Sequence, residues 1–316
     1  MIGQRTKQFV AALVLLSQPL MVPAMSSGSS SAGSSGSSSS VGLTLREAPN
    51  ARSAALAESY TACHDDVAAF TYNPSALSYL SDPRVSILYH KGMLDDAYAH
   101  LSIGIPMGTR GVGISVGTYD GGPVQLYDGT TEKTVTAERD VMASVAYANR
   151  TRLLSWGLAL KMISSELAES AKGTAAAADA GLQIPLSSRV QAGIALQNMG
   201  SRMTYIEAEH NLPRVARAGL ALKTPSGTFS SLLLLDTVYD INDESIRPAL
   251  GLELTKSLIA LRLGYKFGHT LEGLTAGAGI SLGLCALDYS FGIVDKLENH
   301  HRISLSLALG RRGDKK

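Results

Sequence analysis

The sequence predicts an all-β protein: a 14-stranded antiparallel transmembrane β-barrel with a short N-terminal plug. Three observations support this. Apolar and polar residues alternate with a period of two through most of the chain after residue 84, the pattern of strands with one apolar face. Tight connections between the strands tend to alternate with longer polar ones, as in outer-membrane barrels. Charged residues are only 17% of the 316, below the roughly 25% of ordinary soluble domains.

The first part of the chain has the features of a secretion signal. Arg5 and Lys7 precede a short apolar run, and small residues lead up to Ala24, after which we expect cleavage. The apolar run is too short to cross a bilayer as a helix. We therefore interpret residues 1–24 as a signal peptide, with an uncleaved amphipathic segment as the alternative. Residues 25–40, almost entirely Ser and Gly, are expected to form a flexible tether.

The alternating runs follow one another from residue 84 to residue 310, which we expect to be the barrel. Strands are predicted near residues 84–90, 96–106, 109–119, 138–149, 152–165, 173–185, 187–198, 213–224, 227–239, 245–255, 257–268, 271–283, 284–294 and 300–310. An even count places both ends of a barrel on one side, so residues 311–316 are expected to be a periplasmic tail. A soluble β-sandwich would also alternate, but its polar face would be richer in charge.

Residues 41–80 interrupt the alternation and are expected to fold into the lumen as a plug, in its periplasmic half. Asp65 or Asp66 can cap a short helix, and Asn73 can cap a turn that begins at Pro74. The segment is too apolar for a solvated tail, because it contains Leu56, Tyr60, Val67, Phe70, Tyr72, Leu77 and Tyr79.

The same segment resembles a known family. The run from Ala51 to Ala62, the pair Asp65-Asp66 and the run Tyr72-Asn73-Pro74-Ser75-Ala76-Leu77 resemble the N-terminal signature of PorV/PorQ-type proteins and their treponemal relatives. These are FadL-like outer-membrane barrels. The resemblance assigns the plug motif to Asp65, Asp66, Tyr72, Asn73 and Pro74. Ser75 departs from the usual Ala, and Ala57-Glu58 stands where many relatives have paired glycines.

This resemblance implies a location in the outer membrane, in contact with its lipid, and uptake or passage of hydrophobic small molecules such as fatty-acid-like ligands. The PorV branch implies an alternative: a binding or secretion-associated barrel without transport. The apolar residues in the predicted loop 199–212 offer a surface for a protein partner under that alternative.

Six charged residues are expected on the inner face of the barrel and form a predicted polar patch: Lys161, Arg217, Asp236, Glu253, Arg262 and Asp288. A two-residue turn at Ser226-Gly227 would place Arg217 opposite Asp236. The functional interpretation is a polar constriction or a patch that orients a ligand. The alternative is plain internal pairing, because charges in such a place must be compensated.

Other functions have little support in the sequence. A net charge of +1 argues against nucleic-acid binding. We find no nucleophile elbow and no phosphate loop, so neither an enzyme nor a cofactor is predicted. The pair His300-His301 has no Cys or Asp at ligand spacing, so no metal site is expected. Whether Cys63 and Cys285 form a disulfide is left open.

Overall fold

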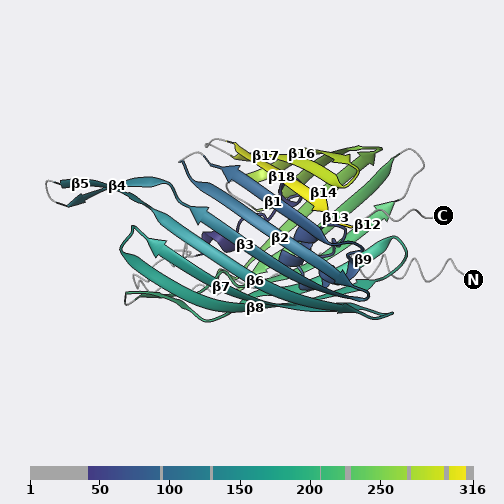
Figure 1. Ribbon diagram of the computed structural model, residues 1–316, viewed down its shortest axis with the longest axis horizontal. Helices are drawn as coiled ribbons and strands as arrows, with labels where there is room; N and C mark the ends of the chain where they lie inside the picture. Colours follow the sequence, from purple (N-terminus) through teal and green to yellow (C-terminus); the bar gives the residue numbers. More distant parts are fainter. Residues whose placement is uncertain are drawn as a thin grey trace, which may run out of the picture. The chain divides into compact units, whose positions relative to one another are not determined.

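Fourteen strands close into one antiparallel barrel, which confirms the predicted fold class (Figure 1). Around the barrel the order is β1-β18-β17-β16-β15-β14-β13-β12-β9-β8-β7-β6-β3-β2. The computed structural model describes residues 42–92, 95–128, 131–206, 208–224, 229–268, 272–294 and 299–310. The expected signal peptide, tether and C-terminal tail lie outside the described residues.

The barrel strands closely follow the predicted ranges. Their bounds are β1 (Arg84–Lys91), β2 (Ala97–Met107), β3 (Arg110–Asp120), β6 (Glu138–Arg150), β7 (Ser155–Leu167), β8 (Ala171–Pro185), β9 (Val190–Gly200), β12 (Val215–Thr224), β13 (Ser230–Asp240), β14 (Ser245–Lys256), β15 (Ile259–Lys266), β16 (Glu272–Leu282), β17 (Cys285–Val294) and β18 (His300–Ala308).

The two ends of the barrel differ. We call one the turn end, where β2 meets β3 and β6 meets β7, and the other the loop end. Two predicted loops at the loop end contain further hairpins, β4 (Pro123–Asp128) with β5 (Thr131–Thr136) and β10 (Met203–Tyr205) with β11 (Ala208–His210). The first hairpin extends away from the barrel wall (Figure 1).

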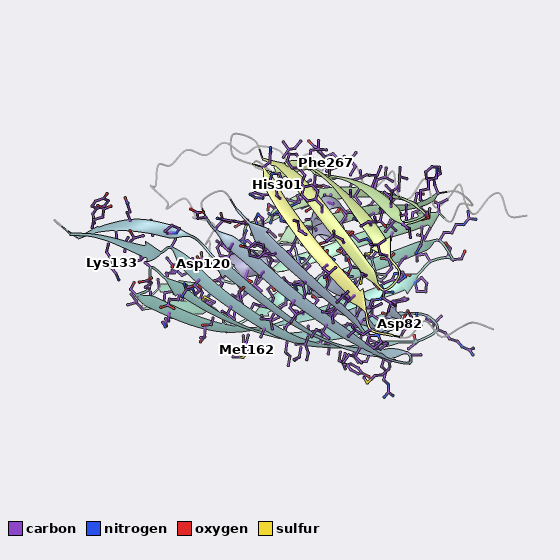
Figure 2. The ribbon with its side chains drawn as sticks, turned by 45° about the horizontal axis from the view of Figure 1, so that its top comes forward. Asp82, Asp120, Lys133, Met162, Phe267 and His301 are labelled. Atoms are coloured by element: carbon purple, nitrogen blue, oxygen red, sulfur yellow. The ribbon has the colours of Figure 1, made fainter. Side chains whose placement is uncertain are left out.

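Side chains alternate between the two faces of the wall. In β7, Leu158, Leu160 and Met162 point outward and are 55–65% exposed, whereas Lys161 and Ile163 between and beside them are buried. Figure 2 shows Met162 on the outside of the barrel. An apolar outer face and a polar inner face are characteristic of a barrel that spans a membrane.

No helix in the described part of the chain is long and apolar enough to cross a membrane.

The plug, residues 42–80, lies inside the barrel. It consists of short helices joined by turns: η2 (Leu43–Leu45), α2 (Ala51–Ala55), η3 (Val67–Thr71) and η4 (Pro74–Tyr79). The backbone N–H of Thr44 lies 3.4 Å from a carboxylate oxygen of Asp140, near the loop end. Leu77 packs against Gly111, near the turn end. The plug therefore runs along the lumen, and the expectation that it fills only one half was wrong.

The barrel wall has glycines, and therefore no side chains, at several places where the plug contacts it. Four cross-strand pairs consist of two glycines each: Gly104–Gly113, Gly157–Gly181, Gly193–Gly219 and Gly251–Gly264. Each pair faces the plug. A Cβ on Gly157 would lie 2.5 Å from the backbone of Pro74, and one on Gly193 would lie 2.3 Å from the carbonyl oxygen of Thr61. The plug backbone can reach the wall because these positions have no side chain.

We predict that Leu160→Arg, on the outer face of β7, destabilises the membrane-inserted barrel by about 2–4 kcal/mol, because an arginine near the bilayer midplane must be desolvated. Leu153→Arg is the matched control, since Leu153 is 79% exposed in the β6–β7 turn. Urea titration of both variants in lipid vesicles, followed by heat-modifiable gel migration, measures the difference. Equal stability of the two variants would contradict a lipid-facing β7.

Candidate functional site

Asn73 ties the plug to the wall. Its side-chain oxygen accepts hydrogen bonds from the backbone N–H and hydroxyl of Ser75, as expected for the cap of η4. Its amide nitrogen also donates to three carbonyl oxygens, those of Thr61 (2.8 Å), Leu182 (3.1 Å) and Ile194 (3.3 Å). Leu182 and Ile194 belong to β8 and β9, so Asn73 connects two turns of the plug to two strands as well as capping a helix.

The aspartate pair has two separate roles. Asp66 is the N-cap of η3, where its carboxylate accepts from the N–H of Ala68, which decides between the two candidates for that cap. The same carboxylate accepts from Asn50 (2.6 Å) and from the hydroxyl of Tyr60 (3.1 Å). These bonds hold α2, η3 and the loop between them as one unit.

Asp65 belongs to an ion network between plug and wall. Arg52 lies between Asp65 (2.9 Å) and Glu253 (2.8 Å), and Arg262 joins Glu253 (2.6 Å) to Asp288 (2.7 Å). Burial alone would raise the pKa of Asp65, but the Arg52 guanidinium and the more distant Lys223 outweigh it and hold that pKa well below its usual range. The plug carboxylate therefore stays ionised and paired.

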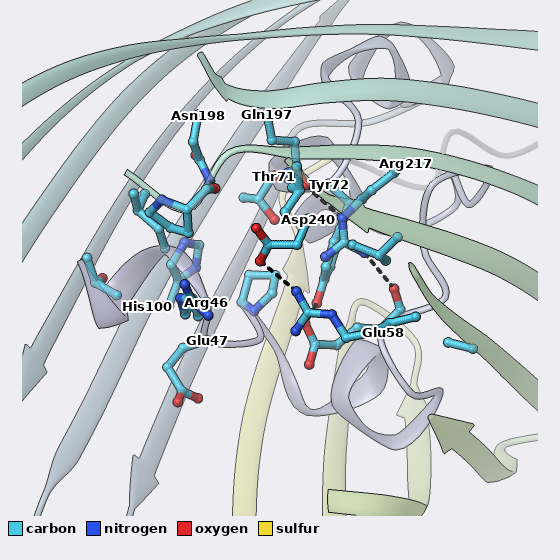
Figure 3. Close-up of a pocket in the computed structure, with 18 of the residues that line it drawn as sticks. Arg46, Glu47, Glu58, Thr71, Tyr72, His100, Gln197, Asn198, Arg217 and Asp240 are labelled. Carbon is cyan, nitrogen blue, oxygen red and sulfur yellow. Dashed lines mark hydrogen bonds and ion pairs between the residues drawn. The ribbon is translucent and has the colours of Figure 1, made fainter. Parts of the chain in front are cut away.

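The larger cavity, of about 320 Å³, lies between the plug and the loop-end half of the wall (Figure 3). Its lining includes the apolar side chains Leu45, Tyr98, Met142, Pro213, Val215 and Val238. Charged side chains line it as well, among them Arg46, Glu47, Glu58, Lys161, Arg217, Asp240, Arg247, Lys266 and Arg302. The two kinds are interspersed, because Val238 lies opposite Arg217 on one side and Arg247 on the other. Such a lining suits a molecule with both apolar and polar groups.

The charges around this cavity are mostly paired. Lys266 lies 2.7 Å from Glu58, and Arg247 lies 2.7 Å from Asp240. Arg217 is held differently: it donates to the side-chain oxygen of Gln197 (2.7 Å) and its guanidinium lies over the ring of Tyr72; Figure 3 labels all three residues.

A second cavity, of about 220 Å³, lies at the turn end. Consecutive plug residues Ala62, Cys63, His64 and Asp65 form one side of it, and residues from β9, β12, β13 and the β8–β9 connection form the other. Two of these wall residues, Arg189 and Lys223, are basic. The plug therefore contributes residues to both cavities.

The six predicted patch residues fall into four groups. Glu253, Arg262 and Asp288 are together in the ion network. Lys161 bonds Asp179 (2.7 Å) and Asn198 (2.8 Å), and Arg217 bonds Gln197. Asp236 accepts hydrogen bonds from the backbone N–H (3.0 Å) and the hydroxyl of Thr61. Of the six, only Lys161 and Arg217 line the larger cavity.

The expected Arg217–Asp236 pairing was wrong. Arg217 faces Val238 and Asp236 faces Gly219, a register two residues away from the prediction. A shift of two residues leaves every side chain on the same face, so the apolar pattern could not detect it. The tip of that hairpin, where Ser226-Gly227 was expected to turn, lies outside the described residues.

Several charged residues inside the barrel were not predicted from the sequence. Arg247, Lys266 and Arg302 line the larger cavity from inward positions of β14, β15 and β18, a signal already present in the period-two alternation. Arg52 and Glu58 lacked any such signal, because the plug has no regular periodicity and their partners on the wall are about 200 residues away. Asn198 has a left-handed backbone (φ 59°) at an irregularity between β8 and β9.

The loop 199–212 does not present the expected apolar surface. Met203, Tyr205 and Leu212 are at most 5% exposed and pack inward against Met142 and Ile163, while Ile206 is 82% exposed. The hairpin β10–β11 therefore covers the lumen from the loop end. The apolar character that suggested a partner surface is explained by burial of this loop.

Both cysteines are free, so they do not form a disulfide with each other: Cys63 is buried and Cys285 is exposed. Burial, with the neighbouring Asp65 carboxylate, raises the pKa of the Cys63 thiol, which keeps it protonated and unreactive. Across the described ranges, no group of three or more His, Cys, Asp or Glu side chains could hold a metal ion.

The fold is similar to that of solved hydrocarbon channels. The Pseudomonas putida toluene transporter TodX matches with a TM-score of 0.60 and 12% identity, covering 82% of this chain and 97% of TodX. A Pseudomonas aeruginosa FadL homologue matches with a TM-score of 0.54 and 10% identity, covering 81% and 97%. The CymD monoaromatic hydrocarbon channel matches with 0.52 and 13%, covering 78% and 94%. At these identities the similarity establishes the fold alone.

No protein family model and no curated protein matches the sequence.

We predict that Gly181→Ala loosens the plug by about 2–3 kcal/mol, because its Cβ would lie 2.0 Å from the Asn73 side-chain oxygen and displace several buried hydrogen bonds. Gly273→Ala is the matched control, since its nearest neighbour would be 3.7 Å away. Hydrogen–deuterium exchange over residues 60–78 measures the effect. If both alanine variants exchange like the original protein, the Asn73 connection does not hold the plug.

We predict that lowering the pH destabilises the plug around His64. Burial lowers the pKa of this ring below its ordinary value of 6.5, opposed by the adjacent Asp65 carboxylate. Because the folded plug favours the neutral His64 ring, the plug has its full stability above about pH 6.5. It loses stability as the pH falls below that value and protonation of the ring becomes favourable in the unfolded plug. Amide exchange over residues 60–66, corrected for intrinsic rates, should rise between about pH 7.5 and 5.5.

His64→Gln should remove most of this pH dependence, whereas His301→Gln, on the outer face, should leave it unchanged. An equally steep profile in His64→Gln would assign the acid sensitivity to another group.

Proposed function

We propose that this protein is a FadL-like outer-membrane barrel, exported with a cleaved signal peptide, that takes up or passes hydrophobic small molecules through its lumen. The observation that carries this proposal is the larger cavity: a space of about 320 Å³, lined in part by apolar side chains, between the plug and the wall of a barrel with an apolar outer face. Its volume lies at the lower end of the roughly 300–1,000 Å³ range of small-molecule sites.

The lining favours a ligand with an apolar body and a polar or anionic end, such as a fatty-acid-like molecule. Met142 and Tyr98 supply apolar surface, and Arg217 supplies a positive charge whose guanidinium donates to the Gln197 side-chain oxygen and lies over the Tyr72 ring. The structural neighbours are described as a toluene transporter and hydrocarbon channels, which supports a hydrophobic cargo and a channel instead of an enzyme.

The alternative, a PorV-like binding barrel without transport, remains a proposal based on the plug motif. It would be favoured by a large apolar surface on the loops. The loop 199–212 buries three of its large apolar side chains instead, so the structure gives this alternative no additional support.

The test uses purified barrel in detergent and in liposomes. Native mass spectrometry is expected to find a retained apolar molecule, and proteoliposomes should take up laurate faster than empty liposomes and should not take up glucose. Met142→Asp should weaken laurate binding roughly tenfold, because it replaces apolar surface in the cavity with a charge of the same sign as the ligand. Met107→Asp, exposed at the turn end, is the control.

Uptake of laurate no faster than through empty liposomes, with no molecule retained in the purified barrel, would overturn the proposed transport. Retention of a stoichiometric protein partner in its place would favour the PorV-like alternative.

A further inference from the structure

Two acidic side chains are neighbours on the inner face of β6, at the loop end. Glu138 and Asp140 are two residues apart on this strand, so both point inward and their Cα atoms lie about 7 Å apart. Glu138 is 7% exposed and Asp140 is fully buried. We call these two residues the acidic pair. Two carboxylates this close repel each other, and they are costly to bury without a compensating charge.

No side chain in the described part of the chain supplies that charge. The basic residues at neighbouring wall positions, Arg139 and Lys172, pair with carboxylates on the outer face instead. The acidic pair accepts one weak hydrogen bond, from the backbone N–H of Thr44 to Asp140 at 3.4 Å. One carboxylate oxygen of Glu138 and one of Asp140 are buried without a hydrogen-bond partner. The pair therefore differs from the other buried acids of the lumen, such as those bonded to Lys161 and Arg262.

Two hydroxyl groups lie beside the acidic pair. Ser165 of β7 is the cross-strand partner of Asp140 and shares its face of the wall. On its other side Ser165 pairs with Gly173 of β8, where a Cβ would lie 3.2 Å from the ring of Tyr205. Tyr205, from the hairpin β10–β11, thus covers the same row of positions and interacts electrostatically with both carboxylates. The hydroxyl oxygens of Ser165 and Tyr205 are also buried without a hydrogen-bond partner.

The chemistry of these four groups suits a hard divalent cation. Calcium binds carboxylate, hydroxyl and water oxygens at 2.3–2.6 Å in a flexible geometry, so two carboxylates and two hydroxyls are enough protein ligands when water fills the remaining positions. The cation would neutralise the acidic pair and provide a partner for the buried oxygens at the same time. Zinc fits less well, because it prefers nitrogen and sulfur ligands and the cluster contains neither.

The position of the cluster also suits an external ion. Glu138 is the first residue of β6 and keeps some exposure at the loop end. The longer loops of outer-membrane barrels are extracellular, so this end is expected to face the outside. Extracellular calcium sites work at dissociation constants of about 0.1–1 mM, which a site with only two carboxylates can provide.

We propose that Glu138, Asp140, Ser165 and Tyr205 form a calcium site that ties the hairpin β10–β11 to the barrel wall. Glu138 and Asp140 supply the charge, Ser165 supplies a ligand from the next strand, and Tyr205 supplies one from the hairpin. The bound ion therefore joins β6, β7 and the covering hairpin, whether or not the barrel transports a hydrophobic molecule.

The first experiment measures binding with terbium, which replaces calcium in oxygen sites and emits light when a nearby tyrosine is excited. Purified full-length barrel, treated with EDTA and then freed of it, should give tyrosine-sensitised emission that calcium chloride displaces. Glu138→Gln and Asp140→Asn keep the side-chain size and should each weaken terbium binding roughly tenfold or more, because a charged ligand is lost. Glu166→Gln, on the outer face of β7 at the same end, is the matched control and should bind terbium like the original protein.

The second experiment measures hydrogen–deuterium exchange over β10 and β11. Calcium at 10 mM should slow this exchange roughly tenfold relative to EDTA, if the dissociation constant is about 1 mM. The double variant Glu138→Gln/Asp140→Asn should exchange equally with and without calcium. Tyr205→Phe keeps the ring packed against Gly173 and loses only the hydroxyl, so it should reduce the effect of calcium without changing exchange in EDTA.

Three results would overturn the calcium site. The first is exchange that calcium does not slow, or that potassium chloride of the same ionic strength slows equally. The second is a double variant that retains the calcium effect. The third is exchange that slows on acidification but not with calcium, which would show that the acidic pair shares a proton and binds no cation.

Discussion

The close approach of the plug backbone to the barrel wall is the contact on which the rest of this structure depends. It requires inward positions without side chains, and the four cross-strand glycine pairs supply them. At these places the wall accepts a backbone, such as that of Thr61 against Gly193 or Pro74 against Gly157. The glycine-rich inner face is thus explained by what it contacts, because a fourteen-stranded barrel lined with larger side chains would leave no room for an internal segment.

Charge compensation follows from the same contact. A plug that excludes water from the middle of the lumen must pair the charges it covers, since an unpaired buried charge is costly. Arg52 does this between Asp65 and Glu253, and Lys266 does it for Glu58. Desolvation offsets much of the attraction within each intact pair, but removal of one partner leaves the other charge buried and uncompensated, which is strongly destabilising. Plug and wall are therefore energetically coupled through a small number of side chains.

The sequence predicted the strands of the barrel well, but it predicted less about the contacts of the plug and the loops inside the barrel. Period-two alternation was sufficient to predict the fourteen strands, because each strand has one face toward lipid and one toward the lumen. The same alternation could not fix register, so Arg217 was assigned the wrong partner by two residues. The role of Asn73 as a cap was recognisable locally, but its bonds to Leu182 and Ile194 depend on tertiary structure. The apolar loop 199–212 suggested a partner surface because burial of a hairpin cannot be read from composition.

Residues 42–80 fill the lumen of the barrel while leaving an internal cavity. The most direct test is ion conductance of the full-length barrel in a planar bilayer. A plugged lumen predicts no stepwise conductance in potassium chloride, and stepwise conductance after residues 42–80 are deleted. Stable, large conductance steps from the intact protein would show that the lumen is open to water and ions and that residues 42–80 do not close it.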